Sequence, residues 1–414
     1  MKKLKKILII SFFLIIYVYV CNIMLLPQNV IIFAGEELNI KTIFGLRISN
    51  ANTQAPQIVH AAKNIESDSR IYKTAGTFEL NLDLFGAIPV KEINVNVIDR
   101  TKVIPCGDLI GIKMYTPGVL VVGMSEIQGN DSKKYRPYAN SGIEEGDMIV
   151  EMNNIKISNT NELIEVVNAS KGKEIKIKYE RNDEQFLTSI TPIQTGVKDY
   201  KIGLWVRDAA AGVGTLTFYE PSTGNFAALG HGIIDSDTGG IFNIANGELV
   251  GSKLLSIKKG ERNNPGEIKG ALDSFEFIGK ISKNTNLGVF GSVSNQGELN
   301  LTKSKEYEVA LRSEITTGEA EIICELEDGK KDFYKIEIEK IYTSNNYDNK
   351  SMLIKVTDER LLEKTGGIVQ GMSGSPIIQN GKFIGAVTNV LVSDPTTGYA
   401  IFGDLMVKKM REIE

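Results

Sequence analysis

The sequence has very few residues of the two kinds that build most metal centres and disulfide scaffolds. Its 414 residues include three cysteines and two histidines. Cys21, Cys106 and Cys324 lie far apart and form no Cys-x-x-Cys pair, which excludes a disulfide scaffold and a zinc site of cysteines. We therefore expect no metal or other cofactor. Histidine chemistry, if there is any, must use His60 or His231.

The sequence also has no large excess of charge of either sign. It has 47 basic and 51 acidic residues, a net charge of −4, and no basic cluster beyond the N-terminus. This balance excludes a typical nucleic-acid-binding surface. Glycine is frequent, with 40 residues, and valine and isoleucine are abundant. Such a composition favours β-strands joined by tight turns, so we predict a mainly β fold.

A long hydrophobic run occurs at the N-terminus, where residues 7–26 carry no charge and follow four lysines. Its length matches the hydrocarbon core of a bilayer, and the lysines predict a cytoplasmic N-terminus with the remaining chain outside. A cleaved signal peptide is the alternative. Its apolar region would be shorter, and no small-residue cleavage site precedes Pro27. We expect a single membrane anchor.

Composition and patterning divide the chain into four parts. Residues 1–28 are expected to be a cytoplasmic tail and transmembrane anchor, and residues 29–104 a segment of β-strands with a polar linker at Asn50–Thr74. Two further blocks, residues 105–192 and 193–414, each carry motifs of their own.

The first block contains a recognisable succession of turns, a strand and a helix. Gly146-Asp147 precedes the apolar segment MIVEM, Asn153-Asn154 predicts a second turn, and residues 158–160 can cap a helix with apolar residues at helical spacing. This succession resembles a PDZ domain. The resemblance implies a peptide ligand, and the segment that fits its carboxylate-binding loop is Leu109-Ile110-Gly111-Ile112. The alternative is that these four residues form only a core strand.

The second block contains the segment Gly371-Met372-Ser373-Gly374-Ser375-Pro376. A nucleophilic serine needs an exposed hydroxyl on a tight turn beside free backbone N–H groups, and the glycines permit such a turn. The segment looks like the Gly-Asp-Ser-Gly-Gly-Pro element of chymotrypsin-like serine proteases. On that comparison Ser373 is the nucleophile, and the amides of Gly371 and Ser373 form the oxyanion hole. An ordinary turn between strands is the alternative.

His231 lies between two glycines in Ala-Leu-Gly-His-Gly-Ile, so its neighbours cover the imidazole little. His60 lies in the polar linker, where nothing rigid would hold its ring. If the chain is a Ser–His hydrolase, the general base is therefore His231. A structural histidine bonded to a backbone carbonyl is the ordinary alternative.

Together, the segments around His231 and Ser373 resemble the stage IV sporulation protein B family of serine peptidases. The order of membrane segment, PDZ domain and peptidase is also similar. One position departs from the family pattern, because Asn389 stands where a histidine is expected. The resemblance implies a chymotrypsin-like β-barrel peptidase domain.

The family resemblance points to an acidic residue shortly before the serine as the third member of a triad, which here is Asp358. Its carboxylate would orient the ring of His231. Asp358 can equally be the N-cap of a helix that begins Glu-Arg-Leu-Leu. In chymotrypsin-like proteases the acid follows the histidine instead, and that spacing favours Asp273. Both candidates stay open from the sequence.

The resemblance also implies a function. The enzyme would act outside the cytoplasm, between the two membranes around a developing spore, and cut a regulator of an intramembrane protease to trigger sigma-factor activation. It would also cleave itself, for which Asn50–Ser69 is the candidate stretch. Its PDZ domain would bind a peptide of the substrate, of another protein or of its own chain. Two alternatives are a non-catalytic PDZ adaptor with a decayed protease domain, and an HtrA-like quality-control protease, in which the PDZ domain follows the protease.

Overall fold

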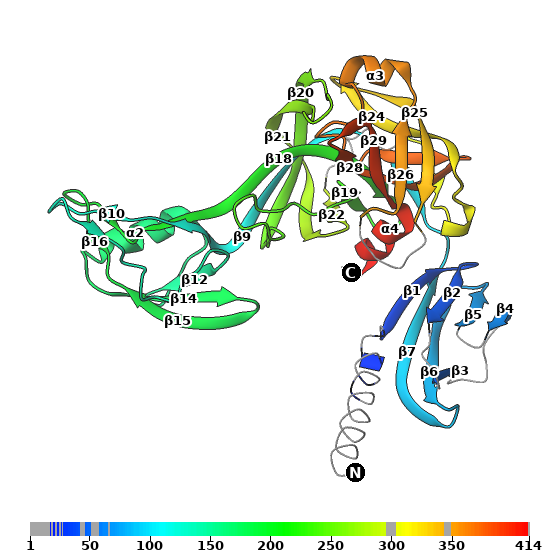
Figure 1. The fold of residues 1–414 in the computed structure, drawn as a ribbon, viewed down its shortest axis with the longest axis horizontal. Coiled ribbons are helices and arrows are strands. Elements are labelled where there is room, and N and C mark those ends of the chain that lie inside the picture. Colours follow the sequence, from blue (N-terminus) through cyan, green and yellow to red (C-terminus); the bar gives the residue numbers. More distant parts are fainter. Residues whose placement is uncertain are drawn as a thin grey trace, which may run out of the picture. The chain divides into compact units, whose positions relative to one another are not determined.

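The computed structural model describes residues 28–41, 46–50, 58–64, 67–294, 304–342 and 349–412, with a few single residues between 17 and 26. The fold is mainly β, as the composition predicts (Figure 1). It divides into two units, Met1–Thr101 and Lys102–Glu414. No helix among the described residues is long and apolar enough to cross a membrane. The predicted anchor at residues 7–26 lies mostly outside the described residues.

The first unit contains two sheets. The larger has the strand order β1-β7-β6-β3, in which β1 is parallel to β7 and the other pairs are antiparallel. The smaller has the order β2-β5-β4. The strands are β1 (Asn29–Phe33), β2 (Glu37–Lys41), β3 (Leu46–Asn50), β4 (Ile58–Asn64), β5 (Ser67–Tyr72), β6 (Gly76–Leu84) and β7 (Ile88–Ile98).

Two of these strands, β4 and β5, lie within Asn50–Thr74, which was expected to be a linker. They pair with each other, and β5 also pairs with β2. Tyr72 at the end of β5 is 1% exposed and stacks on Phe78, so the segment is held by the core of the unit. The expectation was wrong because a polar composition does not prevent backbone pairing. The candidate cleavage stretch Asn50–Ser69 falls partly in these strands and partly outside the described residues.

The second unit contains a closed barrel of six strands in the order β24-β25-β26-β29-β28-β27, which confirms the predicted β-barrel. Asn380 and Gly381, both with positive φ, form the hairpin turn between β27 and β28. The elements of this part are β24 (Gly318–Glu327), β25 (Lys330–Ile341), β26 (Met352–Val356), α3 (Glu359–Thr365), β27 (Pro376–Gln379), β28 (Lys382–Leu391), β29 (Asp394–Phe402), α4 (Gly403–Arg411) and the short 3₁₀ helix η2 (Arg312–Glu314).

Six other strands of this unit form a second closed circuit. Their order is β9-β20-β21-β22-β19-β18, and β18 closes the circuit because it pairs with β9 as well as with β19. Buried side chains, including Ile112, Phe226 and Val289, fill its interior. The strands are β9 (Leu109–Met124), β18 (Leu204–Glu220), β19 (Asn225–Ala228), β20 (Asn246–Lys258), β21 (Glu267–Thr285) and β22 (Gly288–Val293), with β8 (Lys102–Pro105) and β23 (Tyr307–Glu308) beside β18.

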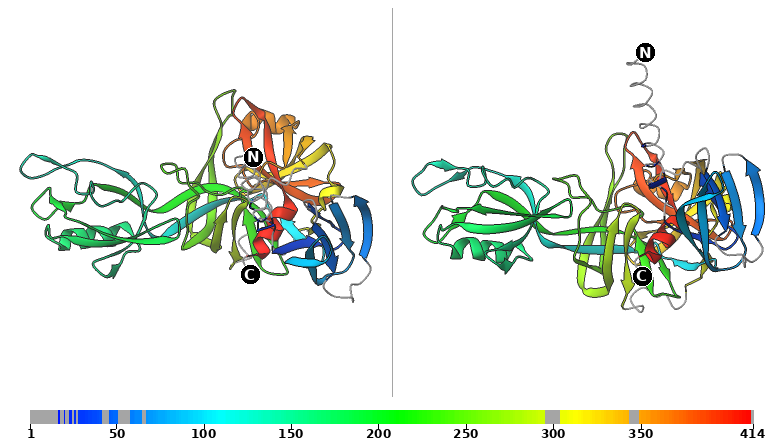
Figure 2. Two further views of the ribbon diagram at one scale, coloured as in Figure 1. Left: turned by 60° about the horizontal axis from the view of Figure 1, so that its bottom comes forward. Right: turned by 90° about the horizontal axis from the view of Figure 1, so that it is seen from below.

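The PDZ part is built on the C-terminal half of β9 and the N-terminal end of β18. The two strands lie side by side in all views (Figure 2). Buried Leu163 and Val167 of its helix pack into its core, and Leu204 and Val206 of β18 pack against that core. Asn153 and Asn154 adopt positive φ at the predicted turn. Its elements are β10 (Ile127–Gln128), β11 (Lys134–Tyr135), β12 (Met148–Met152), β13 (Ile155–Lys156), α2 (Thr160–Ala169), β14 (Ile175–Arg181), β15 (Glu184–Ile190), β16 (Ile193–Gln194) and β17 (Tyr200–Lys201).

The PDZ part is therefore built directly onto β9 and β18 of the second circuit, whereas residues 105–192 and 193–414 were expected to be consecutive domains. The first half of β9 belongs to the circuit, where it pairs with both β18 and β20. The expected parts do not include this sharing of β9, because a long strand shared by two domains leaves no turn or linker in the sequence to mark it.

Candidate active site

The loop that carries Ser373 leads into β27 and turns at two glycines. Gly371 has a φ of 98° and Gly374 a φ of 97°, a region that favours glycine. A Cβ atom at Gly374 would lie 2.2 Å from the carbonyl oxygen of Thr215, so a side chain does not fit there. The side chain of Ser373 is half-buried, whereas Ser375 is fully buried. Of the two serines in the motif, Ser373 alone is accessible.

The backbone at this turn offers free hydrogen-bond donors. Within the described part of the chain, no acceptor contacts the N–H groups of Gly371 and Ser373. The N–H of Gly374, between them and the strand, is already bonded to the carbonyl of Val387 at 2.8 Å. Gly371 and Ser373 are the two residues predicted to form the oxyanion hole, and their unpaired amides have the chemistry that it needs.

His231 follows a strained turn at the end of β19. Leu229 and Gly230 both have a φ of 70°, and the N–H of Gly230 donates to the carbonyl of Ala228 at 2.9 Å, a three-residue γ-turn around Leu229. A branched, non-glycine residue in this conformation costs free energy, and such strain is frequent at functional sites. The turn directs the backbone of His231 away from the strand.

The Nδ1 atom of His231 lies 2.9 Å from the carbonyl oxygen of Gly232. A carbonyl oxygen only accepts hydrogen bonds, so Nδ1 carries the proton in the neutral ring and Nε2 is left as the basic nitrogen. Burial lowers the pKa of His231, and the hydrogen bond to Gly232 opposes the shift in part. The ring is therefore neutral and competent as a base at neutral pH.

His231 and Ser373 line the same cavity, of about 430 Å³. Among the described residues, no carboxylate or amine lines it, and most of the lining is aliphatic. In this structure the hydroxyl of Ser373 donates to the carbonyl of Thr388 at 2.7 Å. The residues around it are Ile112, Ala210, Ala211, Gly212, Val213, Leu229, Ile233, Ile368, Val369, Gln370, Gly371, Thr388, Asn389 and Val390.

One buried residue joins the two loops. The N–H of Thr215 donates to the carbonyl of Ser373 at 3.1 Å, and its Oγ1 donates to the carbonyl of Gly371 at 2.7 Å. Its own carbonyl accepts from the N–H of Leu229 at 3.2 Å, directly before the histidine. Thr215 on β18 thus ties the serine loop of one barrel to the histidine loop of the other circuit. No sequence motif marked it.

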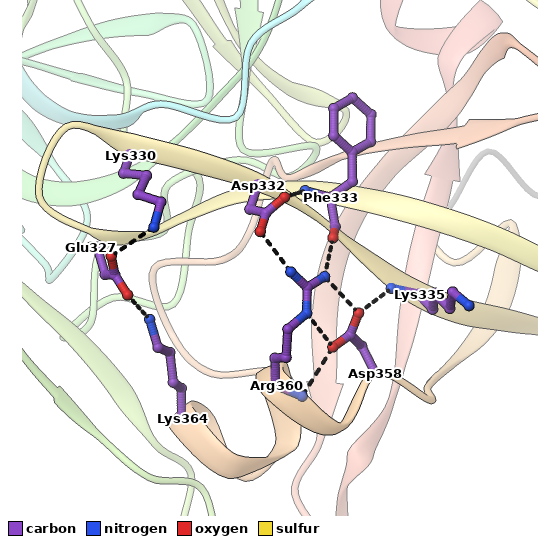
Figure 3. A network of polar contacts seen from close by, with 8 residues as sticks. All are labelled: Glu327, Lys330, Asp332, Phe333, Lys335, Asp358, Arg360 and Lys364. Carbon is purple, nitrogen blue, oxygen red and sulfur yellow. Dashed lines mark hydrogen bonds and ion pairs between the residues drawn. The ribbon is translucent and has the colours of Figure 1, made fainter.

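Asp358, the first candidate for the third triad member, lies in a separate network (Figure 3). Its carboxylate accepts hydrogen bonds from the guanidinium and the N–H of Arg360 and from the N–H of Lys335. The contact with Arg360 lowers the pKa of Asp358 to about 2 despite burial. Asp358 is thus the N-cap of α3, the alternative that the sequence left open, and it does not contact His231.

The rival candidate, Asp273, does not contact the histidine either. Its carboxylate lies 3.4 Å from the amine of Lys253 and accepts from the N–H of Phe275 at 3.1 Å. Neither aspartate lines the cavity. The prediction that one of them orients His231 is not met by this structure, in which the carbonyl of Gly232 makes that contact.

Asn284 fixes the segment after the histidine, and sequence reasoning missed it. Its side-chain oxygen accepts from the N–H of Ile233, and its side-chain nitrogen donates to the carbonyls of Ile233 and Phe242, all at 2.8–2.9 Å. It lies on β21, far from the motif in sequence. An asparagine in a strand gives no signal of such a role until its partners are known.

The predicted carboxylate-binding loop Leu109–Ile112 is placed differently from expectation. These residues form the start of β9, with Ile110 and Ile112 buried in the second circuit. Ile110 to Ile112 pair with β18 on one side and β20 on the other, so this backbone cannot receive a peptide. The prediction was wrong, and the alternative of a core strand is correct. The small Gly111 is needed because its Cβ would overlap Leu272 and Val250.

The described residues contain no group of three histidine, cysteine, aspartate or glutamate side chains that could hold a metal ion. A serine, a neutral histidine and two free amides thus surround one cavity, and these are the groups that acyl transfer uses.

The chain was compared with solved structures and with curated proteins. The PDZ domain of an SdrC-like protein from Listeria monocytogenes is 22% identical over 22% of this chain and 87% of that one, with a TM-score of 0.17. The active form of the Rv3671c protease from M. tuberculosis is 13% identical over 49% of this chain and 74% of that one, with a TM-score of 0.29. No curated protein gives a significant match.

The family comparisons cover most of the second unit. The PDZ domain family matches residues 109–191. The family described as SpoIVB peptidase S55 matches residues 198–407, which include both His231 and Ser373. The chain belongs to the SpoIVB peptidase S55 family and is a serine peptidase with a PDZ domain.

Proposed function

We propose that this serine peptidase is an exported, membrane-anchored endopeptidase in which Ser373 is the nucleophile and His231 the general base. The observation that carries the assignment is that both side chains line one cavity, beside the unpaired amides of Gly371 and Ser373. The hydrophobic run at residues 7–26, preceded by lysines, supports the anchor and the exported position of the peptidase.

The reaction follows from the positions of these groups. The hydroxyl of Ser373 leaves the carbonyl of Thr388 and gives its proton to Nε2 of His231 while the oxygen attacks the scissile carbonyl carbon. The amides of Gly371 and Ser373 donate to the oxyanion that forms. The imidazolium of His231 then protonates the leaving amine, and water hydrolyses the acyl-enzyme by the reverse sequence of proton transfers. The carbonyl of Gly232 holds the ring throughout.

The family supports a role in sporulation, in which the enzyme cuts a regulator of an intramembrane protease and so triggers sigma-factor activation. Membership of the family also supports self-cleavage near the N-terminus. The PDZ domain supports recognition of a peptide or protein, either the substrate or a segment of the same chain.

The two serines of the motif provide the test. A fluorophosphonate probe is added to the full chain and to the Ser373→Ala and Ser375→Ala variants, and the labelled peptide is identified by mass spectrometry. Ser375 is the matched control because its hydroxyl is buried and has no partner among the described residues. We expect Ser373→Ala to abolish labelling and Ser375→Ala to keep it. Labelling of Ser373→Ala at the wild-type rate would exclude the proposal.

A further inference from the structure

Strand β18 connects the PDZ part with the catalytic circuit. Its residues Leu204 and Val206 pack against the PDZ core, and Leu216 is buried in the circuit. The pairing of β18 with β9 is interrupted between Trp205 and Val206 and again between Arg207 and Ala209. The partner strand is β9 on both sides, so the register of the pair shifts at Arg207 and Asp208, which lie between the two cores.

The side chain of Asp208 is bonded to the PDZ helix. Its Oδ2 atom accepts a hydrogen bond of 2.7 Å from the N–H of Thr160, the first residue of α2. A carboxylate at this end of a helix also interacts favourably with the helix dipole. The backbone carbonyl of Asp208 accepts from Oγ1 of Thr116 on β9 at 3.1 Å. The strand and the start of the helix are thus held together.

The neighbouring side chain, Arg207, is bonded to the loop that follows His231. Its guanidinium forms ion pairs with Asp235 and, at 2.5 Å, with Asp237. The side chain of Asp235 is only 1% exposed, so Arg207 compensates a buried charge. The other oxygen of Asp235 accepts from the N–H groups of Asp237 and Thr238, which closes the turn.

The turn at Asp235 is in direct backbone contact with the segment beside the imidazole. The N–H of Asp235 donates to the carbonyl of Gly240 at 2.9 Å, and the N–H of Phe242 donates to the carbonyl of Ile233 at 2.9 Å. His231 itself precedes Ile233 by one glycine. A displacement of the Asp235 turn therefore reaches the general base through a short, hydrogen-bonded segment.

We propose that Arg207 is a positioning residue for His231, and that Arg207 and Asp208 together couple helix α2 of the PDZ domain to the histidine loop. The inference rests on the proposed role of His231. A ligand that moves α2 or the adjoining part of β18 shifts Asp208, and the preceding residue, Arg207, transmits the shift to Asp235. The PDZ domain then controls the rate of the chemical step through the position of the base, in addition to any capture of substrate.

The first test compares two buried ion pairs of the same kind. Arg181 pairs with Asp147 in the PDZ part, and the arginine and aspartate side chains are 29% and 1% exposed, against 33% and 1% for Arg207 and Asp235. Arg207→Gln and Arg181→Gln are assayed as full chains on a short peptide that includes the cleavage site. We expect Arg207→Gln to lower kcat about 10- to 100-fold with KM nearly unchanged, because a misplaced base slows the chemical step. Arg181→Gln should lose similar thermal stability and keep kcat.

The chain has two histidines, so the state of His231 can be followed directly by NMR. Arg207→Gln should shift the titration of the His231 ring, and Arg181→Gln should leave that titration unchanged. In the kinetic assay, Arg207→Lys should keep a higher kcat than Arg207→Gln. Equal kcat values and equal titrations for Arg207→Gln and Arg181→Gln would overturn the positioning role. If Ser373→Ala kept full activity, the proposed function would fail instead, so the two failures are distinguishable.

The second test addresses the coupling through two residues at the start of α2. Asp208 and Asn159 each provide one side-chain acceptor to its first turn, from β18 and from the helix's own N-cap. We expect Asp208→Ala to lower kcat severalfold and to add little to Arg207→Gln in the double variant, while Asn159→Ala keeps kcat. Equal effects of Asp208→Ala and Asn159→Ala, or full additivity with Arg207→Gln, would contradict the coupling.

Discussion

The Nδ1 atom of His231 contacts the main-chain carbonyl of the next residue, Gly232, at 2.9 Å. In a Ser-His-Asp triad, a carboxylate occupies this position and fixes the tautomer of the ring. A carbonyl oxygen fixes the same tautomer, since it also accepts the Nδ1 proton, but it brings no negative charge to stabilise the imidazolium. In the proposed mechanism the base is therefore oriented by the backbone.

The first prediction follows for the two aspartates. Asp358→Asn should keep kcat within about twofold, because Asp358 contacts Arg360 and Lys335 and not the histidine. Asparagine is also a good N-cap, and the ion pair that is lost, with Arg360, is partly exposed. The free energy of unfolding should therefore fall by less than about 1 kcal/mol. Asp273→Asn should behave alike. Steady-state kinetics and thermal unfolding measure both effects; a loss of about 10⁴-fold in kcat for either variant would identify it as the missing triad member.

The second prediction concerns pH. Burial lowers the pKa of His231, so the ring stays neutral to a lower pH than a free imidazole, whose pKa is about 6.5. The acid limb of kcat/KM against pH should therefore have its midpoint below 6.5. Near that pH, His231 binds more protons in the unfolded chain than in the folded one. Its titration therefore lowers the free energy of unfolding as the pH falls below about 6.5. A midpoint above 6.5, in a chain shown by circular dichroism to be folded, would contradict the assignment.

The sequence was informative where chemistry depends on a short segment. The turn around Ser373 could be predicted because two glycines and a proline restrict the backbone within six residues, and the PDZ helix could be predicted from its cap and apolar spacing. Contacts between distant segments could not be predicted from the sequence. Thr215 and Asn284 hold the two loops, but neither residue belongs to a recognisable motif. In the sequence, Asp358 also cannot be told from a catalytic acid, because its contact with Arg360 appears only in the structure.

The PDZ boundary shows a second limit. Leu109–Ile112 has the pattern of both a carboxylate-binding loop and a central strand, because each alternates apolar residues around a glycine. Only the pairing of β9 with β18 and β20 distinguishes the two. A strand shared by two domains has no break in its sequence, so the sharing of β9 and β18 by the PDZ part and the second circuit could not be predicted.

The third prediction concerns the residue that the cavity accepts. Mostly aliphatic and small side chains line it, and the described residues place no carboxylate or amine there to pair with a charged substrate side chain. A charged side chain would lose its hydration there without compensation, so peptides with an apolar residue before the scissile bond should be preferred by about 100-fold or more over charged ones. A peptide library assayed by mass spectrometry measures this preference.

Gln370 provides a sharper form of the same test. It lines the cavity and its side chain is exposed, so Gln370→Glu adds a carboxylate with almost no change in shape. We expect this variant to gain cleavage after lysine and arginine relative to the parent, with Gln370→Met as the uncharged control. An unchanged preference in Gln370→Glu would mean that the substrate side chain binds elsewhere.

The last prediction tests self-cleavage. If Ser373 cuts its own chain, the wild-type protein expressed in membranes should yield a shorter, released form, whereas Ser373→Ala should remain full-length and membrane-bound. Ser375→Ala is again the control and should be processed normally, since its buried hydroxyl has no hydrogen-bond partner in the described part of the chain. Mixing Ser373→Ala with active enzyme then distinguishes cleavage within one chain from cleavage between chains. Processing of Ser373→Ala on its own, with the same N-terminus as the wild type, would assign the cut to another protease and leave the candidate stretch Asn50–Ser69 as an ordinary proteolytic site.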